Sequence, residues 1–166
     1  MTKLTLLFLL FLAGCRTAEE YNYAQHQFDP QTIKKIPLYD SLSQVLLQNL
    51  SVLEPQIKEE GAFMYNRSEG DLPLNGKMPA AAAEKINRYF AQLGDKYFGG
   101  FSVYKDSTIR YTVRDTFLER YQLNIREHIS YYPNGGTMRR RKAPDKDTIL
   151  NRNWHYWIRF DKEEMF

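Results

Sequence analysis

The sequence predicts an α+β fold in which two helices pack on one face of a four-stranded antiparallel sheet. Two observations predict it. Residues 40–93 carry apolar side chains at helical spacing, whereas apolar and polar residues alternate from Phe101 onward. Helical segments followed by consecutive strands are typical of a helical layer that covers an antiparallel sheet. We therefore expect one two-layer α+β domain over residues 38–166.

The first expected helix runs from Asp40 to Glu54. The segment Ser41–Gln44 matches a capping box, in which side chains satisfy the first free N–H groups of a helix. Pro55 is expected to end or kink the helix, because proline has no amide hydrogen. The apolar residues that fall on one helical face are Leu42, Val45, Leu46, Leu50 and Leu53.

The second expected helix begins at Pro79 and ends at Gly94. Proline suits the first turn of a helix, the alanine run 80–83 has high helix propensity, and glycine suits a helix C-terminus. The loop that precedes it, residues 66–77, is rich in Gly, Pro and Asn. An apolar stripe completes the pattern: Ile86, Tyr89, Phe90 and Leu93.

The four expected strands lie between Phe101 and Phe160. Loops at 106–108 and 115–117 keep the apolar side chains of neighbouring strands on one face, so we expect a three-residue loop or a bulge at 115–117. Pro133–Gly136 breaks the long strand, and the charged run 139–147 is expected to be a solvated excursion. Residues 154–160 alternate again and form the last expected strand.

The polar side of this sheet gathers cations and rings. Guanidinium groups recognise phosphate and carboxylate and stack on aromatic rings, so such a face would suit an anionic glycan, a lipid headgroup or an acidic protein. An exposed sheet face is polar in any case, so the same residues would also fit a merely solvated surface. The candidate residues are Arg110, Arg114, Arg120, Arg126, His128, His155, Trp157 and Arg159.

No catalytic or metal-binding motif accompanies this face. The three histidines, His26, His128 and His155, form no metal-ligand pattern, and we expect no catalytic residue, metal or cofactor. Glu119 and Glu127 share the parity of the core-facing stripe. Positions at the rim of the sheet explain them best, and an internal polar pocket is the alternative.

The N-terminus carries a targeting signal rather than structure. Lys3 precedes the short apolar run 4–12, which is too short to cross a bilayer, and Leu12-Ala13-Gly14-Cys15 follows. This order resembles the bacterial lipoprotein signal. The resemblance implies that residues 1–14 are removed, that Cys15 is multiply acylated and that it holds the chain in a membrane. Cys15 is the single cysteine of the 166 residues, so no disulfide is expected.

Residues 15–37 are expected to be a lipidated tether, whose extended reach is on the order of 65 Å. Its aromatic residues leave room for part of it to pack on the domain. Arg16 follows the cysteine where an Asp would resemble an inner-membrane retention signal, so an outer-membrane location is favoured, with the leaflet left open.

The expected function is that of a lipid-anchored, non-catalytic binding or scaffold subunit of a membrane-associated assembly. The expected partners are the membrane and an envelope protein, anionic glycan or lipid. After cleavage the chain would carry 22 cations and 20 anions, so nucleic-acid binding is not expected. The alternative is a periplasmic ligand-binding or hydrolytic domain with a pocket between helices and sheet. A deep cavity that contains Glu127 or Glu119 with a histidine would favour that alternative.

Overall fold

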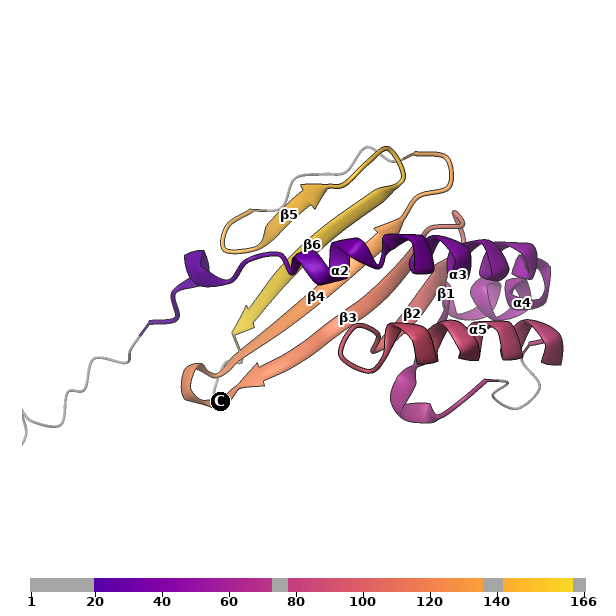
Figure 1. Cartoon of the computed structure of the whole chain (residues 1–166), viewed down its shortest axis with the longest axis horizontal. Helices are drawn as coiled ribbons and strands as arrows, with labels where there is room; N and C mark the ends of the chain where they lie inside the picture. Colours follow the sequence, from indigo (N-terminus) through magenta and orange to yellow (C-terminus); the bar gives the residue numbers. More distant parts are fainter. Residues whose placement is uncertain (1–19, 73–77, 136–141, 163–166) are drawn as a thin grey trace, which may run out of the picture.

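A computed structural model describes residues 20–72, 78–135 and 142–162. These residues form one antiparallel sheet with four helices on one face, so the predicted α+β class is confirmed (Figure 1). The sheet has six strands in the order β1-β2-β3-β4-β6-β5, rather than the predicted four. The strands are β1 (Ala62–Asn66), β2 (Gly100–Tyr104), β3 (Ile109–Leu118), β4 (Leu123–Tyr131), β5 (Lys146–Ile149) and β6 (Trp154–Lys162).

The two additional strands, β1 and β5, lie at the two edges of the sheet. β1 pairs only with β2, and β5 pairs only with β6. β5 occupies the end of the charged run 139–147, whose described part is therefore not a purely solvated excursion, while residues 139–141 lie outside the described residues. β5 has no buried residue, so its sequence carries no alternation signal, whereas β1 buries Ala62, Phe63 and Tyr65 but is only five residues long.

The helical layer differs from the prediction at its first element. The expected helix 40–54 is two helices, α3 (Ile36–Gln48) and α4 (Leu50–Glu60), which meet at Asn49, and Pro55 lies inside α4 instead of ending it. The second predicted helix is confirmed as α5 (Ala80–Leu93), with Gly94 as its C-cap. A short helix, α2 (Pro30–Lys34), precedes α3.

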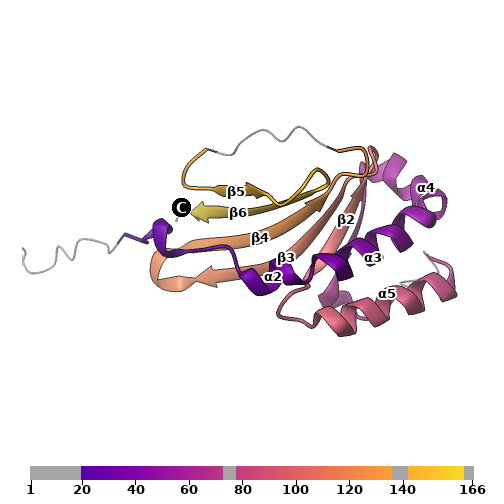
Figure 2. The same ribbon diagram turned by 45° about the horizontal axis from the view of Figure 1, so that its top comes forward.

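The core lies between α3, α5 and the sheet (Figure 2). The predicted apolar stripe faces the helices, because Ile109, Tyr111 and Leu123 are fully buried there. Tyr111 donates to or accepts from Ser43 on α3 at 2.7 Å, which joins the two layers by a buried polar contact. Burial of this stripe supplies the main driving force for folding.

The expected tether packs on the domain over its described part, residues 20–37. A 3-10 helix η1 (Tyr23–Gln25) and α2 run across β4 and β6 (Figure 1). Tyr23 contacts Phe160 edge to face, with ring centroids 5.1 Å apart, and Phe28 contacts Tyr156 in the same way at 4.8 Å. The folded domain therefore begins by residue 20 and not at residue 38, and the long reach expected of the tether is lost.

The turn between β3 and β4 lies at Glu119–Gln122, not at 115–117, and contains a 3-10 helix, η3 (Glu119–Tyr121). The irregularity expected at 115–117 is a bulge between Thr112 and Arg114. Thr112 pairs with His128, but Arg114 pairs with Glu127, so one extra residue shifts the alternation of β3. Arg114 therefore lies on the helix side of the sheet, which corrects its predicted place on the cationic face.

Candidate functional site

A buried polar cluster joins the N-terminal segment to the sheet. Glu127 on β4 is 1% exposed. Its carboxylate accepts hydrogen bonds from His26 Nε2 at 3.3 Å and from Tyr156 Oη at 2.5 Å. The Arg114 guanidinium lies 3.1 Å from the same carboxylate and 3.4 Å from Asp29, which precedes α2. The bulge in β3 is what brings Arg114 into this cluster.

The electrostatics of the cluster favour an ionised Glu127. Burial alone raises the pKa of its carboxyl group, but the hydrogen bonds from His26 and Tyr156 and the charge of Arg114 outweigh burial. The net result is a pKa below the ordinary value of 4.5. Burial and the same carboxylate raise the pKa of the Tyr156 hydroxyl far above its ordinary value, so this tyrosine stays a hydrogen-bond donor.

Glu127 and His26 thus meet, as the pocket alternative requires, but in a packed setting. The His26 ring contacts Phe160 edge to face at 5.6 Å and bonds to the Tyr21 hydroxyl at 3.2 Å. Neither Glu127 nor His26 lines a cleft described below, and both predicted outcomes for Glu127, a rim position and a pocket, give way to a buried ion-paired one. Glu119 is exposed in η3. Among the described residues, no group of three or more His, Cys, Asp or Glu side chains suits a metal ion.

The arginines on the opposite face of the sheet lie beside carboxylates. Arg126 lies 3.3 Å from Asp115 and 3.4 Å from Asp161. Arg159 donates from Nε to Asp161 at 2.6 Å. These pairs offset much of the positive charge that the sequence predicted for this face. Exposed pairs of this kind contribute little to stability, but they lower the charge available to an anionic partner.

The remaining residues of the predicted face form a packed aromatic layer. The Arg110 guanidinium lies 5.1 Å from the Tyr104 ring centre and 5.3 Å from that of Trp157. Trp157 stacks on His128 at 4.0 Å and donates from its indole N–H to Ser130. Trp157 and His128 are 4% and 8% exposed, which contradicts the picture of an open cationic surface.

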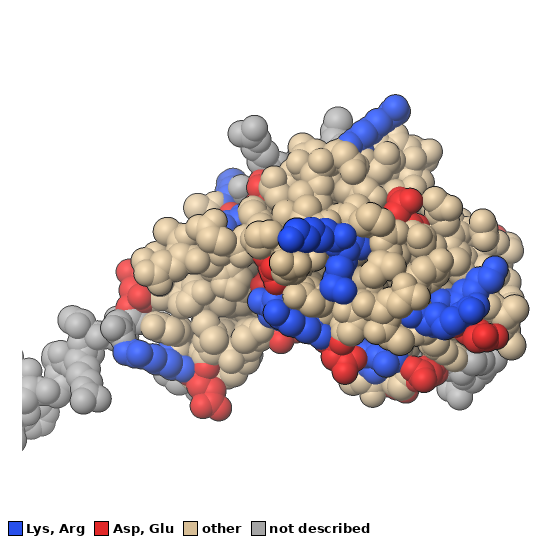
Figure 3. All heavy atoms as spheres, viewed as in Figure 1, with Lys and Arg blue, Asp and Glu red and all other residues tan. Residues whose placement is uncertain are grey.

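Of the last two predicted residues, His155 shares this face and Arg120 does not. His155 is buried on β6, 4.0 Å from Asp147 on β5, and Arg120 lies over the Tyr121 ring in η3 at the tip of the β3–β4 hairpin. On the helix side, Lys and Arg are interspersed with Asp and Glu (Figure 3). Six of the eight predicted residues therefore share the face opposite the helices, while Arg114 lies on the helix side and Arg120 in the β3–β4 turn. The ion pairs and the burial described above leave no open anion-binding patch among these described residues.

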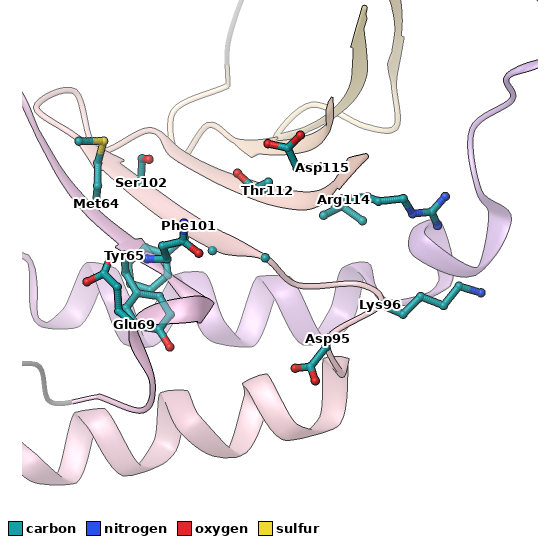
Figure 4. Close-up of a pocket in the computed structure, with 14 residues that line it drawn as sticks. Met64, Tyr65, Glu69, Asp95, Lys96, Phe101, Ser102, Thr112, Arg114 and Asp115 are labelled. Atoms are coloured by element: carbon teal, nitrogen blue, oxygen red, sulfur yellow. Dashed lines mark hydrogen bonds between the residues drawn. The ribbon is translucent and has the colours of Figure 1, made fainter. Parts of the chain in front are cut away.

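A feature that the sequence did not predict is a cleft of about 650 Å³ at the start of β2 (Figure 4). Its floor is backbone at Gly99 and Gly100. A Cβ atom at Gly100 would lie 2.4 Å from the Tyr65 carbonyl oxygen, so only glycine fits this close approach. The residues that line the cleft are Met64, Tyr65, Asn66, Glu69, Asp95, Lys96, Gly99, Gly100, Phe101, Ser102 and 112–115.

The cleft opens onto an unpaired strand edge. β4 pairs with β3 as far as Leu118, whereas β2 pairs with β3 only from Ile109 to Thr112. Gly99 N–H donates to the Thr112 carbonyl at 2.7 Å, and no described strand continues the ladder beyond it. Residues 113–118 of β3 therefore present backbone groups that a further strand would satisfy. A doublet of glycines before a strand was visible in the sequence, but the length mismatch between β2 and β3 was not.

Comparisons with family models, curated proteins and solved structures find no match to this chain. None of the described helices is long and apolar enough to span a bilayer. Cys15 lies outside the described residues.

Proposed function

We propose that the protein is a lipid-anchored, non-catalytic binding subunit of a cell-envelope assembly, and that it takes up an extended segment of a partner protein along β3. The observation that carries this proposal is the unpaired edge at 113–118 beside the cleft at Gly99 and Gly100. Strand addition to an open sheet edge is a common mode of peptide recognition.

The backbone and the side chains of this region would have different roles in binding. The backbone groups of 113–118 would give hydrogen bonds to any extended segment, whatever its sequence. Selectivity would come from side chains along the same path, such as Met64, which lines the cleft and is 64% exposed. Exposed large apolar side chains beside an open edge favour a protein partner over a free glycan.

In this proposal the lipid anchor is attached to Cys15, because Leu-Ala-Gly-Cys resembles the lipoprotein signal. Arg16 favours the outer membrane as the location, with either leaflet. Arg126 and Arg159 form ion pairs with Asp161. An anionic glycan or lipid is therefore a less favoured ligand of the sheet face than a protein partner at the strand edge.

The test is site-specific crosslinking in cells. A photoreactive amino acid is placed at Thr116, within the unpaired edge, and in a matched variant at Lys58, on the exposed surface of α4 at the far end of the molecule. We expect a discrete crosslinked protein from position 116 and none from position 58. A synthetic peptide with the crosslinked partner sequence should then slow amide exchange of residues 113–118 in the purified protein.

Two results would contradict the proposal. Crosslinks from position 58 but not 116 would place the partner on the helices. Slowed exchange confined to α3–α5 would do the same. The anchor has its own test: a fatty acid analogue should label the wild type and not Cys15→Ala, and only the wild type should sediment with membranes.

A further inference from the structure

The first described residues lie at the same end of the molecule as the β3–β4 turn. Figures 1 and 2 both show the N-terminal segment leaving the fold beside this turn, while α4 and the far end of α5 lie at the opposite end. The Tyr21 ring contacts the Tyr121 ring edge to face at 5.2 Å. We call this region the hairpin end; it comprises Tyr21, Tyr23 and 117–122.

The chain between this end and the proposed lipid is short. Only residues 16–19 separate Cys15 from Glu20, the first described residue. A fully extended chain spans at most about 3.5 Å per residue, so Glu20 lies within about 17 Å of the Cys15 Cα atom. An acylated Cys15 would sit at the membrane surface, so this short chain would keep the hairpin end near the lipid headgroups.

The side chains of the hairpin end suit that layer. Phe117 is 44% exposed, and the rings of Tyr21, Tyr23 and Tyr121 are partly exposed, with hydroxyl tips. Tyrosine collects at membrane interfaces because its ring is apolar and its tip is polar. Arg120 is exposed in the same turn, where its long side chain would lie at the level of the phosphate groups of a bilayer at this end.

We propose that the hairpin end is a lipid-binding surface that rests on the headgroup layer and orients the domain, with Phe117 inserted toward the acyl chains. This inference rests on the proposed acylation of Cys15. It goes beyond anchoring, because it fixes which end of the domain touches the bilayer: α4 points away from the membrane, and the unpaired edge of β3 runs outward from it (Figure 1).

The test uses the acylated full chain in vesicles of phosphatidylethanolamine and phosphatidylglycerol that contain brominated acyl chains, which quench nearby tryptophan. Two variants carry one added tryptophan each, Phe117→Trp at the hairpin end and Val52→Trp on α4. The two sites are matched, since their exposed fractions are 44% and 43%. We expect at least twofold stronger quenching of the added fluorescence in Phe117→Trp, and none above the native Trp154 and Trp157 background in Val52→Trp.

Each other outcome is informative. If the acylated protein floats with the vesicles but the two variants are quenched equally, or Val52→Trp more, then the anchor stands and the orientation is overturned. If no fatty acid is attached and the protein does not float, then the anchor of the proposed function fails and this inference falls with it. Equal melting temperatures of both variants and the wild type show that the added rings have not disturbed the fold.

Discussion

At the scale of single residues, Glu127 determines how the N-terminal segment is held. A buried carboxylate is costly unless donors surround it, and here His26, Tyr156 and Arg114 all reach it. His26 lies about a hundred residues before Glu127 in the chain, so the contact closes a long loop. The cluster therefore serves as the polar joint between residues 20–35 and the sheet.

The first prediction concerns the pH dependence of this joint. The folded-state pKa of Glu127 is lowered, so its carboxylate stabilises the fold above pH 4.5, and this contribution is lost as the pH falls through the folded pKa. Glu127→Gln should lower the free energy of unfolding by about 1–3 kcal/mol at pH 7. Because a protonated Glu resembles Gln, the difference from wild type should shrink below pH 4.5.

Urea denaturation at several pH values between 3 and 7 measures this difference. Glu119→Gln is the matched control, since Glu119 is an exposed carboxylate in η3, and it should change stability by less than about 0.5 kcal/mol. A Glu127→Gln deficit that stays constant down to pH 3 would mean that the charge of Glu127 does not stabilise the fold.

The sequence indicates these residues only in part. The parity of Glu127 with the core stripe was visible, and it is on the helix side as that parity implies. Uninterrupted alternation through β3 predicts that Arg114 lies on the opposite face. The bulge after Thr112 interrupts it, and no glycine or proline at 112–114 marks the position. Strand periodicity also cannot show that His26, which lies in the N-terminal segment, is a hydrogen-bond partner of Glu127.

At the scale of elements, residues 20–35 cover part of the sheet, and we call this N-terminal segment the strap. Tyr23 and Phe28 cover Phe160 and Tyr156, so the segment replaces the cover that α3 and α5 give to the other half of the sheet. Without it, the helix side of β4 and β6 would be exposed to water. An apolar face of this kind needs a cover.

The second prediction follows from this packing. A chain that begins at Ile36 should lose at least about 3 kcal/mol of stability, because burial of each aromatic ring contributes about 1.5–3 kcal/mol. Its melting temperature should fall by about 10 °C or more. A chain that begins at Glu20 is the control, and it should have the same melting temperature as a chain that begins at Arg16. Equal melting of all three chains would restore the view that residues 20–35 are a passive tether.

The elements themselves were predictable where a face is half buried. The alternation in β3 and the stripe of α5 predict both the element type and the buried side. In β4 and β6 the alternation predicts the strands, but residues 127–130 and 154–158 are buried on both faces. β1 and β5 were missed because each pairs on one side only and β5 has no buried residue. The register also differs from the prediction: a three-residue loop at 115–117 would pair Tyr111 with Tyr121, whereas Tyr111 pairs with Ile129. Loop length and bulge position together set the register.

At the scale of the whole molecule, the strap changes what the lipid anchor implies. An extended tether of residues 15–37 would let the domain search far from the membrane. Because residues 20–35 are folded, only residues 16–19 lie between the proposed anchor and the described fold. With the proposed anchor, the domain would be positioned rather than merely retained, and the edge of β3 would meet its proposed partner at a fixed height above the lipid.

The last prediction tests this fixed height. Insertion of sixteen Gly and Ser residues after Ala18 should leave acylation and melting temperature unchanged, since the insertion precedes every described contact of the fold. The root-mean-square reach of the free chain should increase from about 11 Å to about 25 Å, as expected for a flexible linker. The effective concentration of the hairpin end at the headgroups falls accordingly. Bromolipid quenching of Phe117→Trp and the crosslink from position 116 should therefore both decrease severalfold.

Replacement of residues 16–19 by Gly and Ser without a change of length is the control, and it should retain both signals. Loss of the signals in this control would mean that the identity of residues 16–19 matters, and not their number. Full quenching in the lengthened chain would show that the hairpin end binds lipid by its own affinity, so a short chain is not needed to hold it there. A crosslink that survives while quenching is lost would separate the partner's position from that of the membrane, because only a partner that moves with the domain tolerates the added height.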